Sequence, residues 1–347
     1  VVSGVGGITK EGTGLAVLLA DNTYAGKTVI SGGTLQVGNG GNRGSLGTGN
    51  VFLAQGAELL FNRAGTVVVD NLIEGDGAIN IQGDVRLTRR NTNTGGTKVV
   101  NGGEFKLTSA GWSGPIEIDG GTVVVPKELT RISLDSTVTV VGGENGIRVE
   151  GSSVATLTGV VTGARGLVKT GSGTLELMGR VSYSGDTELR AGRLNVSNAG
   201  AVGSGALVLS GGAVLGTEKV VEMSNTVKLL AASGSGVGTI DVGGAATTGA
   251  TVSLAGQITG DGGLVKTGVG VLEVSNAAND YKGDTMVDSG TLRLKSGAGL
   301  GDGRLILRPA TELAVSGSST LNNAVEITGG KVNVAEASTL VLASSLN

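Results

Sequence analysis

The chain holds few residues that could support catalysis. It contains no His and no Cys, which excludes the usual general base, the imidazole metal ligand, the thiol nucleophile and zinc or iron–sulfur ligation. No Ser has Gly at both second-neighbour positions, so the nucleophile elbow of hydrolases is absent as well. The sequence predicts no catalytic residue and no cofactor, and most classes of enzyme are excluded.

Two motifs imitate binding sites without completing them. Gly26, Lys27 and Thr28 match the end of a phosphate-binding loop, but the Gly expected five residues before Gly26 is Asp21, so a turn is favoured. Three Asp lie in Gly-Asp-Gly turns and could suit only Ca²⁺ in a chain without His. Each turn offers a single carboxylate, and turn chemistry alone explains Asp beside Gly. The sequence therefore predicts no metal site at Asp76, Asp261 and Asp302.

Basic residues recur in two patterns. Lys10, Lys169 and Lys266 occupy one repeated position and are interpreted as solvated corner residues, too far apart in sequence to form one patch. Arg86, Arg89 and Arg90 form the one basic cluster, and the sequence predicts no catalytic pairing of these arginines with acidic residues. The net charge is −3, so no nucleic-acid partner is expected.

Repeats organise the chain. GGITKEG at 6–12 returns as RGLVKTG at 165–171 and GGLVKTG at 262–268, and each copy continues through Tyr, Gly, a strand-like run, a Gly turn and Leu. A degenerate fourth copy covers 94–107. The predicted structural positions of the three clear copies are Gly12, Tyr24, Gly26, Gly33 and Leu35; Gly171, Tyr183, Gly185, Gly192 and Leu194; and Gly268, Tyr281, Gly283, Gly290 and Leu292.

The repeats predict one continuous fragment over 1–347 with units of about 4–74, 75–162, 163–259 and 260–347. The last residues align with those that precede a new unit, so we expect further repeats on both sides of this segment. Such self-similarity at long period is typical of solenoids.

Short alternating apolar runs separated by Gly, Asn, Asp or Ser predict strands and no sustained helix. We predict an all-β fold: a single-stranded, right-handed parallel β-helix, elongated into a rod, with coils of about twenty residues. The 66 Gly serve tight corners, and only 3 Pro interrupt the strands. A β-propeller or a string of β-sandwiches is the rival architecture, but both usually need more buried aromatic residues than this chain has.

The aromatic residues carry two further predictions. The repeated Tyr24, Tyr183 and Tyr281 are interpreted as plugs that cover the core at a corner, in preference to exposed platforms for sugars. Trp112 lies outside the repeat pattern. If it is exposed, it is the best single candidate for contact with a partner.

The order GGLVKTG, then NDYKGDT, then GLGDG at 262–303 resembles the passenger-associated transport repeat of autotransporters, the type V secretion proteins. The resemblance covers essentially the whole chain. It implies a β-helical passenger exported through the outer membrane and displayed at the bacterial cell surface, with a C-terminal membrane barrel, outside this fragment, as its tether. The absence of Cys agrees with export through an oxidising periplasm.

The resemblance implies a stalk or adhesive passenger segment without catalysis. Its expected partners are a host cell-surface or matrix protein, a glycan, or another copy of the same chain, through weak contacts summed over many coils. Two alternatives remain open: an oligomerising toxin of the vacuolating type, and an inert carrier for a separate enzymatic domain. The toxin would need a membrane-inserting segment, and the best candidate, 231–249, is polar and Gly-rich.

Overall fold

The computed structural model describes residues 1–108, 112, 114–231, 236–244 and 249–344. The candidate membrane-inserting segment 231–249 therefore lies partly outside the described residues. All regular elements in the described ranges are β-strands, and the chain divides into two compact units, 1–167 and 168–347. No described helix has the length and hydrophobicity needed to cross a membrane.

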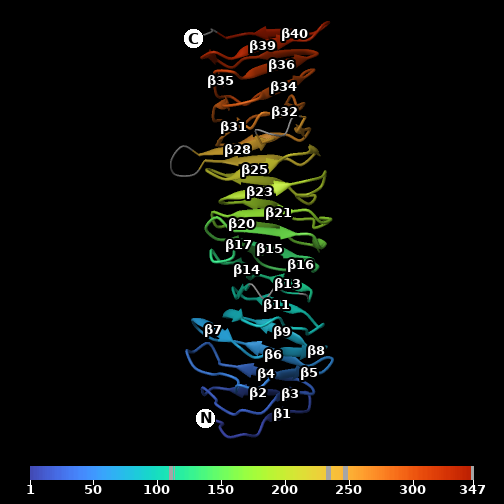
Figure 1. Cartoon of the computed structure of the whole chain (residues 1–347). Coiled ribbons are helices and arrows are strands. Elements are labelled where there is room, and N and C mark those ends of the chain that lie inside the picture. Colours follow the sequence, from blue (N-terminus) through green and yellow to red (C-terminus); the bar gives the residue numbers. More distant parts are fainter. Residues whose placement is uncertain (109–111, 113, 232–235, 245–248, 345–347) are drawn as a thin grey trace. The chain divides into compact units, whose positions relative to one another are not determined.

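In the first unit, the chain winds through parallel sheets whose strands come from successive coils (Figure 1). One sheet contains β1 (Ile8–Lys10), β3 (Thr28–Ile30), β5 (Val51–Leu53) and β8 (Ile73–Gly75). A second contains β2 (Leu15–Leu18), β4 (Thr34–Val37), β6 (Glu58–Phe61), β9 (Ala78–Ile81), β11 (Thr97–Val100), β13 (Ile116–Asp119), β16 (Val138–Val140) and β19 (Val161–Gly163). The others are β7 (Thr66–Val69), β10 (Asp84–Leu87), β12 (Glu104–Lys106), β14 (Thr122–Val125) and β17 (Gly146–Val149), and the pair β15 (Arg131–Leu134) and β18 (Val154–Leu157).

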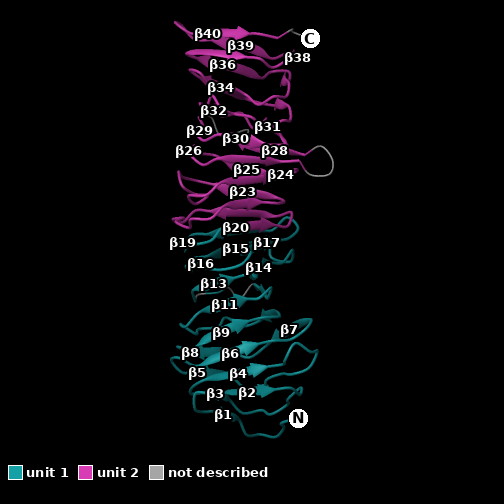
Figure 2. Cartoon of the chain, turned by 180° about the vertical axis from the view of Figure 1, so that it is seen from behind, with its two compact units in different colours: residues 1–167 teal, residues 168–347 magenta. Residues whose placement is uncertain are grey.

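The second unit repeats this arrangement (Figure 2). One sheet contains β20 (Leu167–Thr170, at the boundary), β22 (Thr187–Leu189), β24 (Leu207–Ser210), β27 (Val227–Leu230) and β30 (Ile258–Gly260). A second contains β21 (Thr174–Leu177), β23 (Arg193–Val196), β25 (Val214–Thr217), β28 (Val237–Val242), β31 (Gly263–Thr267), β33 (Thr285–Val287), β35 (Leu305–Leu307) and β38 (Val325–Ile327). The rest are β26 (Val220–Met223), β29 (Thr251–Leu254), β32 (Val271–Val274), β34 (Thr291–Lys295), β36 (Glu312–Ser316) and β39 (Lys331–Val334), and the pair β37 (Ser318–Leu321) and β40 (Thr339–Leu342).

This architecture confirms the prediction of a parallel β-helix. Paired strands lie one coil apart in sequence, from 18 residues between Thr66 and Asp84 to 31 residues between Val220 and Thr251. The longest spacing contains two stretches outside the described residues, 232–235 and 245–248. The described chain therefore follows the coil length of about twenty residues that the sequence suggested, with insertions.

The core of each unit consists of columns of side chains contributed by successive coils. In the first unit, one column runs through Val37, Phe61, Ile81, Val99 and Ile118, which are paired in register on adjacent strands and are all buried. Alternation along each strand sends every second side chain into such a column. Burial of this stacked apolar surface, at about 25 cal/mol per Å², stabilises each coil through its neighbours.

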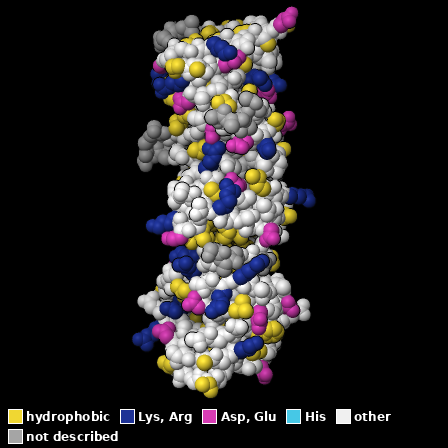
Figure 3. Space-filling view, viewed as in Figure 1, with side chains coloured by type: hydrophobic (Ala, Val, Ile, Leu, Met, Phe, Trp, Pro, Cys, Tyr) yellow, Lys and Arg dark blue, Asp and Glu magenta, His cyan; other side chains and the backbone are white. Residues whose placement is uncertain are grey.

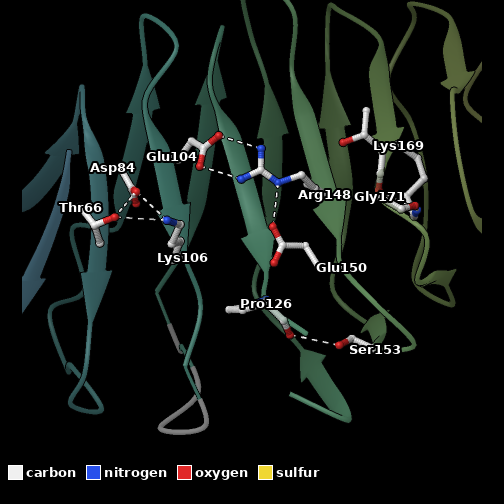
Figure 4. A network of polar contacts seen from close by, with 11 residues as sticks. Thr66, Asp84, Glu104, Lys106, Pro126, Arg148, Glu150, Ser153, Lys169 and Gly171 are labelled. Atoms are coloured by element: carbon white, nitrogen blue, oxygen red, sulfur yellow. Dashed lines mark hydrogen bonds and ion pairs between the residues drawn. The ribbon is translucent and has the colours of Figure 1, made fainter. Parts of the chain in front are cut away.

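The outward side chains form polar ladders across the strands. In Figure 4, Arg148 of β17 makes two hydrogen bonds of 2.7 Å to Glu104 of β12 and one of 3.2 Å to Glu150. The hydrogen bond with Glu104 raises the pKa of Arg148. Along the same sheet, Lys106 contacts Asp84 at 2.5 Å.

These ladders stay in contact with solvent, so their contribution to stability is small. We expect Arg148→Met to lower the free energy of unfolding by no more than about 1 kcal/mol, because exposed ion pairs are screened by water and salt. Urea unfolding in 0.1 M and 1 M NaCl measures this effect. A loss of several kcal/mol would show that the ladder, and not the buried columns, holds the coils together.

The repeat corner as the candidate functional site

The three copies of the repeat fold into one local structure, which we call the repeat corner. It contains a Lys, a Tyr, a Thr and a Gly taken from two successive coils. The members are Lys10, Tyr24, Thr28 and Gly33 in the first copy, Lys169, Tyr183, Thr187 and Gly192 in the second, and Lys266, Tyr281, Thr285 and Gly290 in the third.

The lysines of the repeat corner are buried, and the interpretation of them as solvated corner residues is wrong. Lys169 and Lys266 are 0% exposed and Lys10 is 9% exposed. In the third copy, Lys266 stands in register between Ile240 of β28 and Val287 of β33, inside an apolar column. The four methylene groups of the side chain extend this column, while the ammonium reaches the corner.

Each buried ammonium is held by three backbone carbonyl groups. Lys266 Nζ donates to the carbonyls of Thr267 and Gly268 at 2.7 Å, and to Ser289 of the following coil at 3.1 Å. The same arrangement joins Lys169 to Thr170, Gly171 and Ala191, and Lys10 to Glu11, Gly12 and Gly32, at 2.8–3.1 Å. A buried cation requires such partners, and the third carbonyl ties one coil to the next.

The glycine of the repeat corner comes directly after the residue whose backbone carbonyl accepts the hydrogen bond from the lysine of the preceding coil. Gly290 has φ +72°, and a Cβ added there would lie 2.4 Å from the Gly268 oxygen and 2.6 Å from the Gly270 oxygen. Gly192 and Gly33 have φ +70° and +64° and equally close oxygens from the preceding coil. Only glycine combines this backbone conformation with this approach.

The tyrosines cover the core at the other end of the same strand, before the Thr that begins it. Tyr24, Tyr183 and Tyr281 are at most 1% exposed. Tyr281 Oη lies 2.5 Å from Thr285 Oγ1, and Tyr24 Oη lies 2.6 Å from Thr28 Oγ1; Tyr183 pairs with Thr187 in the same way. Burial raises the pKa of Tyr183 and of Tyr281. These side chains are in the position of a plug and are not available for stacking on sugars.

A further glycine receives each tyrosine ring from the following coil. A Cβ at Gly301 would lie 2.7 Å from Cγ of Tyr281, and a Cβ at Gly203 would lie 2.5 Å from the ring of Tyr183. Gly47 has the same relation to Tyr24. Gly26 and Gly283 also face backbone of the preceding coil at 2.4–2.5 Å. At these glycine positions the coils approach each other too closely for a side chain to fit.

The repeat corners of the second unit do not stack on one face. Lys169 belongs to β20, in the sheet with β22, β24, β27 and β30, whereas Lys266 belongs to β31, in the sheet with β28 and β33. The spacing between these copies therefore includes a fraction of a coil. Repeat length alone could not show this, because it counts residues and not faces.

The other sequence candidates are placed away from any common site. Thr28 faces inward on β3, and the exposed Lys27 lies 3.7 Å from Glu74. The sequence Gly26, Lys27 and Thr28 therefore forms the start of a strand and not a phosphate-binding loop. Asp76 accepts a hydrogen bond from Thr94, and Asp302 contacts Lys282 at 2.7 Å. The described residues contain no group of three or more carboxylates that could hold a metal ion.

Trp112 is buried, so it does not meet the condition of exposure under which it was a candidate for contact with a partner. It is 6% exposed, its ring meets Phe105 edge-on with centroids 5.3 Å apart, and its Nε1 donates to Gly114 at 2.6 Å. The indole packs against Phe105 in the interior of the first unit. Burial satisfies both its apolar ring and its N–H, so the expectation of an exposed contact is corrected.

The buried lysines predict a specific alkaline response. Burial lowers the pKa of both Lys169 and Lys266 to about 8, below the value near 10.4 of an unfolded lysine. Between these values the unfolded chain binds more protons, so the free energy of unfolding rises with pH. Relative to a Lys169→Met/Lys266→Met variant, we expect a gain on the order of 1–3 kcal/mol per lysine from pH 8 to 10.5.

Urea unfolding of both proteins at pH 7.5, 9 and 10 tests this response. The difference in free energy of unfolding between the two proteins cancels the contribution of the buried tyrosines, which is the same in both and has the opposite dependence on pH. A difference that stays constant over this range would show that these ammonium groups titrate as they do in water.

These geometries define a class of protein: a β-helix whose coils are locked at repeated corners. The family model of the passenger-associated-transport-repeat matches residues 8–37, 167–196 and 264–294, and each match contains one complete repeat corner. The degenerate copy at 94–107 is outside the matched residues.

A search of curated proteins gives the same class. The chain is 32% identical over 238 residues, 68% of its length, to the adhesin BmaC autotransporter of Brucella suis biovar 1 (strain 1330). It spans about 6% of the length of that relative. No solved structure matches the chain. The chain belongs to the autotransporter passengers with passenger-associated transport repeats, and its location is the bacterial cell surface, reached by export through the outer membrane.

Proposed function

We propose that this chain is a stalk and adhesive segment that attaches the bacterium to host molecules or to neighbouring cells without catalysis. The observation that carries the proposal is the threefold repeat corner, in which the Lys, the Gly and the Tyr ring contact the backbone of a neighbouring coil. These residues hold successive coils together, which suits an extended structural surface, and their polar groups are already engaged and not free to act in a reaction. The similarity to a protein named an adhesin supports the same role.

The sequence composition supports the non-catalytic part of the proposal. Without His and Cys, a reaction would depend on carboxylates and basic residues alone. Half-buried carboxylates such as Glu104 and Asp284 form ion pairs with arginines of other coils. The four repeat units inferred from the sequence are part of this proposal, each contributing one set of coils to the displayed surface.

Adhesion of coated particles tests the proposed function. Latex beads carrying the whole chain are expected to bind cultured epithelial cells, or one another, more than beads carrying serum albumin. Soluble chain in excess should compete with the beads. If coated beads neither bind cells nor clump, the adhesive role is contradicted, and the chain serves as a passive spacer for other parts of its protein.

A further inference from the structure

The basic cluster of the sequence lies on the outer side of the first unit. Arg86 points outward from β10, in register with Val68 of β7 and Lys106 of β12. Arg89 and Arg90 follow directly after the strand, and all three arginines are exposed. Elsewhere in the described chain, arginines such as Arg148 and Arg193 pair with carboxylates of other coils, and basic and acidic side chains are interspersed on the face in Figure 3. This segment departs from that pattern.

The three arginines have no carboxylate partner. Among the described residues, no Asp or Glu oxygen lies within 4.0 Å of Arg86, Arg89 or Arg90. The nearby carboxylates are engaged elsewhere, since Asp84 contacts Lys106 at 2.5 Å and Asp70 accepts from Thr88 at 2.5 Å. The structure therefore gathers three exposed arginines that form no ion pair with a described carboxylate, in a chain whose net charge is negative.

Arg89 also lines a hollow in the surface. The hollow has a volume of about 260 Å³, with Ser45 and Thr48 on one wall and Asp70 with Arg89 on another. Its apolar lining, which we call its floor, includes the exposed side chain of Val68 beside the buried Phe61. Val68, which is in register with Arg86, belongs to the same lining, so the hollow and the arginines form one surface.

The walls of the hollow are fixed by side chains of neighbouring coils. Asn71 Nδ2 donates to the carbonyls of Gly47 and Gly49 at 2.8 and 2.6 Å. Arg63 donates to the carbonyls of Asn42 and Gly44 at 2.5 and 2.8 Å. Arg89 Nε donates to the carbonyl of Asp70 at 2.7 Å, which orients the guanidinium beside the hollow. A site held this way binds with little loss of freedom.

These features select the chemistry of the ligand. Guanidinium groups bind sulfate and carboxylate in two-pronged geometry, while an apolar floor with hydroxyl walls suits the face and edges of a sugar ring. Nucleic acid is less suitable, because single strands bind by stacking on aromatic residues. The described aromatic side chains are buried except for Phe52, which belongs to a different sheet, on β5.

We propose that Arg86, Arg89, Arg90 and the adjoining hollow form a binding surface for an acidic polysaccharide, with sulfate or uronate groups on the arginines and a sugar ring over the apolar floor. The surface names a partner class for the proposed adhesion and rests on that function for its biological role. A repeating anion allows one ligand chain to engage all three arginines at once.

Binding of the whole chain to immobilised heparin, hyaluronan and neutral dextran tests the proposal. We expect binding to the two acidic polymers, no binding to dextran, and loss of binding near 0.5 M NaCl because salt screens exposed charges. Arg86→Gln/Arg89→Gln/Arg90→Gln should weaken binding at least about tenfold, since three charge-assisted contacts are lost. The matched control Arg165→Gln/Arg180→Gln/Lys219→Gln removes the same charge from exposed sites outside the cluster and the lining of the hollow and should change binding less than about twofold.

Each contrary outcome has a definite meaning. Equal weakening by both triple variants would reduce the effect to net charge and overturn the site. Tighter binding to single-stranded DNA or to phosphatidylserine vesicles than to the polysaccharides would overturn the assignment of the ligand. Beads that adhere to cells while the chain fails to bind heparin and hyaluronan would contradict this inference alone. Heparin binding without cell adhesion would contradict the proposed function instead.

Discussion

Replacing Gly290 with alanine is expected to lower the free energy of unfolding of the second unit by about 3–5 kcal/mol. Part of the loss, about 1–2 kcal/mol, comes from placing a Cβ on a backbone with positive φ. The rest comes from collision with the Gly268 and Gly270 oxygens of the preceding coil, at 2.4 and 2.6 Å, which cannot move without separating the strands. The new methyl group would also lie 2.9 Å from Lys266 Nζ.

A matched variant separates the two causes. Gly297 has φ +73°, close to the +72° of Gly290, but a Cβ there meets no atom within 4 Å. Gly297→Ala should therefore cost only the conformational part, about 1–2 kcal/mol. Urea unfolding followed by circular dichroism measures both variants. If the two substitutions destabilise the unit equally, the close contact between coils at the repeat corner contributes nothing beyond backbone strain.

Replacing Tyr281 with alanine is expected to cost about 3–5 kcal/mol, because the ring is fully buried and its removal leaves a cavity. The cavity would open between Tyr281 and Gly301, where no side chain exists to fill it. Tyr281→Phe keeps the ring and removes only the hydrogen bond to Thr285, so a loss of about 1–2 kcal/mol is expected.

Hydrogen exchange locates the effect of these tyrosine variants. The amides of β33 and β35 should lose protection in Tyr281→Ala, because coils in a solenoid are stabilised mainly by their neighbours. The control Tyr281→Phe should leave this protection largely unchanged. Alanine and phenylalanine variants with the same stability would mean that the ring does not act as a plug of the core.

The fold could be predicted because its signals are local and periodic. Alternation in runs such as Thr34, Leu35, Gln36 and Val37 specifies which side chains face inward, and β4 has that pattern of burial. Glycine at corners and the repeated blocks indicate coils that stack. The rotation of the repeat between faces could not be predicted, because it depends on the summed length of loops that carry no periodic signal.

The buried lysines show where residue type misled the sequence analysis. Lysine is seldom fully buried, so a repeated Lys near a Gly turn suggested a solvated corner. Lys266 is two residues after Leu264, on the same side of β31, but Leu264, Val265 and Lys266 are all buried there, so alternation of burial does not mark the position. What the sequence did not reveal is the third acceptor, the carbonyl of Ser289, which comes from the next coil.

For the basic cluster, the residues could be identified from the sequence, but their spatial neighbours could not. Its three arginines were visible in the sequence, but their lack of acidic partners in space depends on which residues neighbouring coils place in register. Lys106 takes up Asp84, and Arg148 takes up Glu104. Trp112 was also visible, but its burial depends on its packing against Phe105, which sequence spacing did not indicate.

The pairing of neighbouring coils in register is the central claim, and cysteine cross-linking tests it most directly. The chain has no native Cys, and Thr251, Val271 and Thr291 form one row on β29, β32 and β34. Thr251→Cys/Val271→Cys should form an intramolecular disulfide on mild oxidation, because adjacent strands lie about 4.8 Å apart. Thr251→Cys/Thr291→Cys, two strands apart at about 9.6 Å, should not. A disulfide in the second variant and none in the first would contradict the stacked parallel coils.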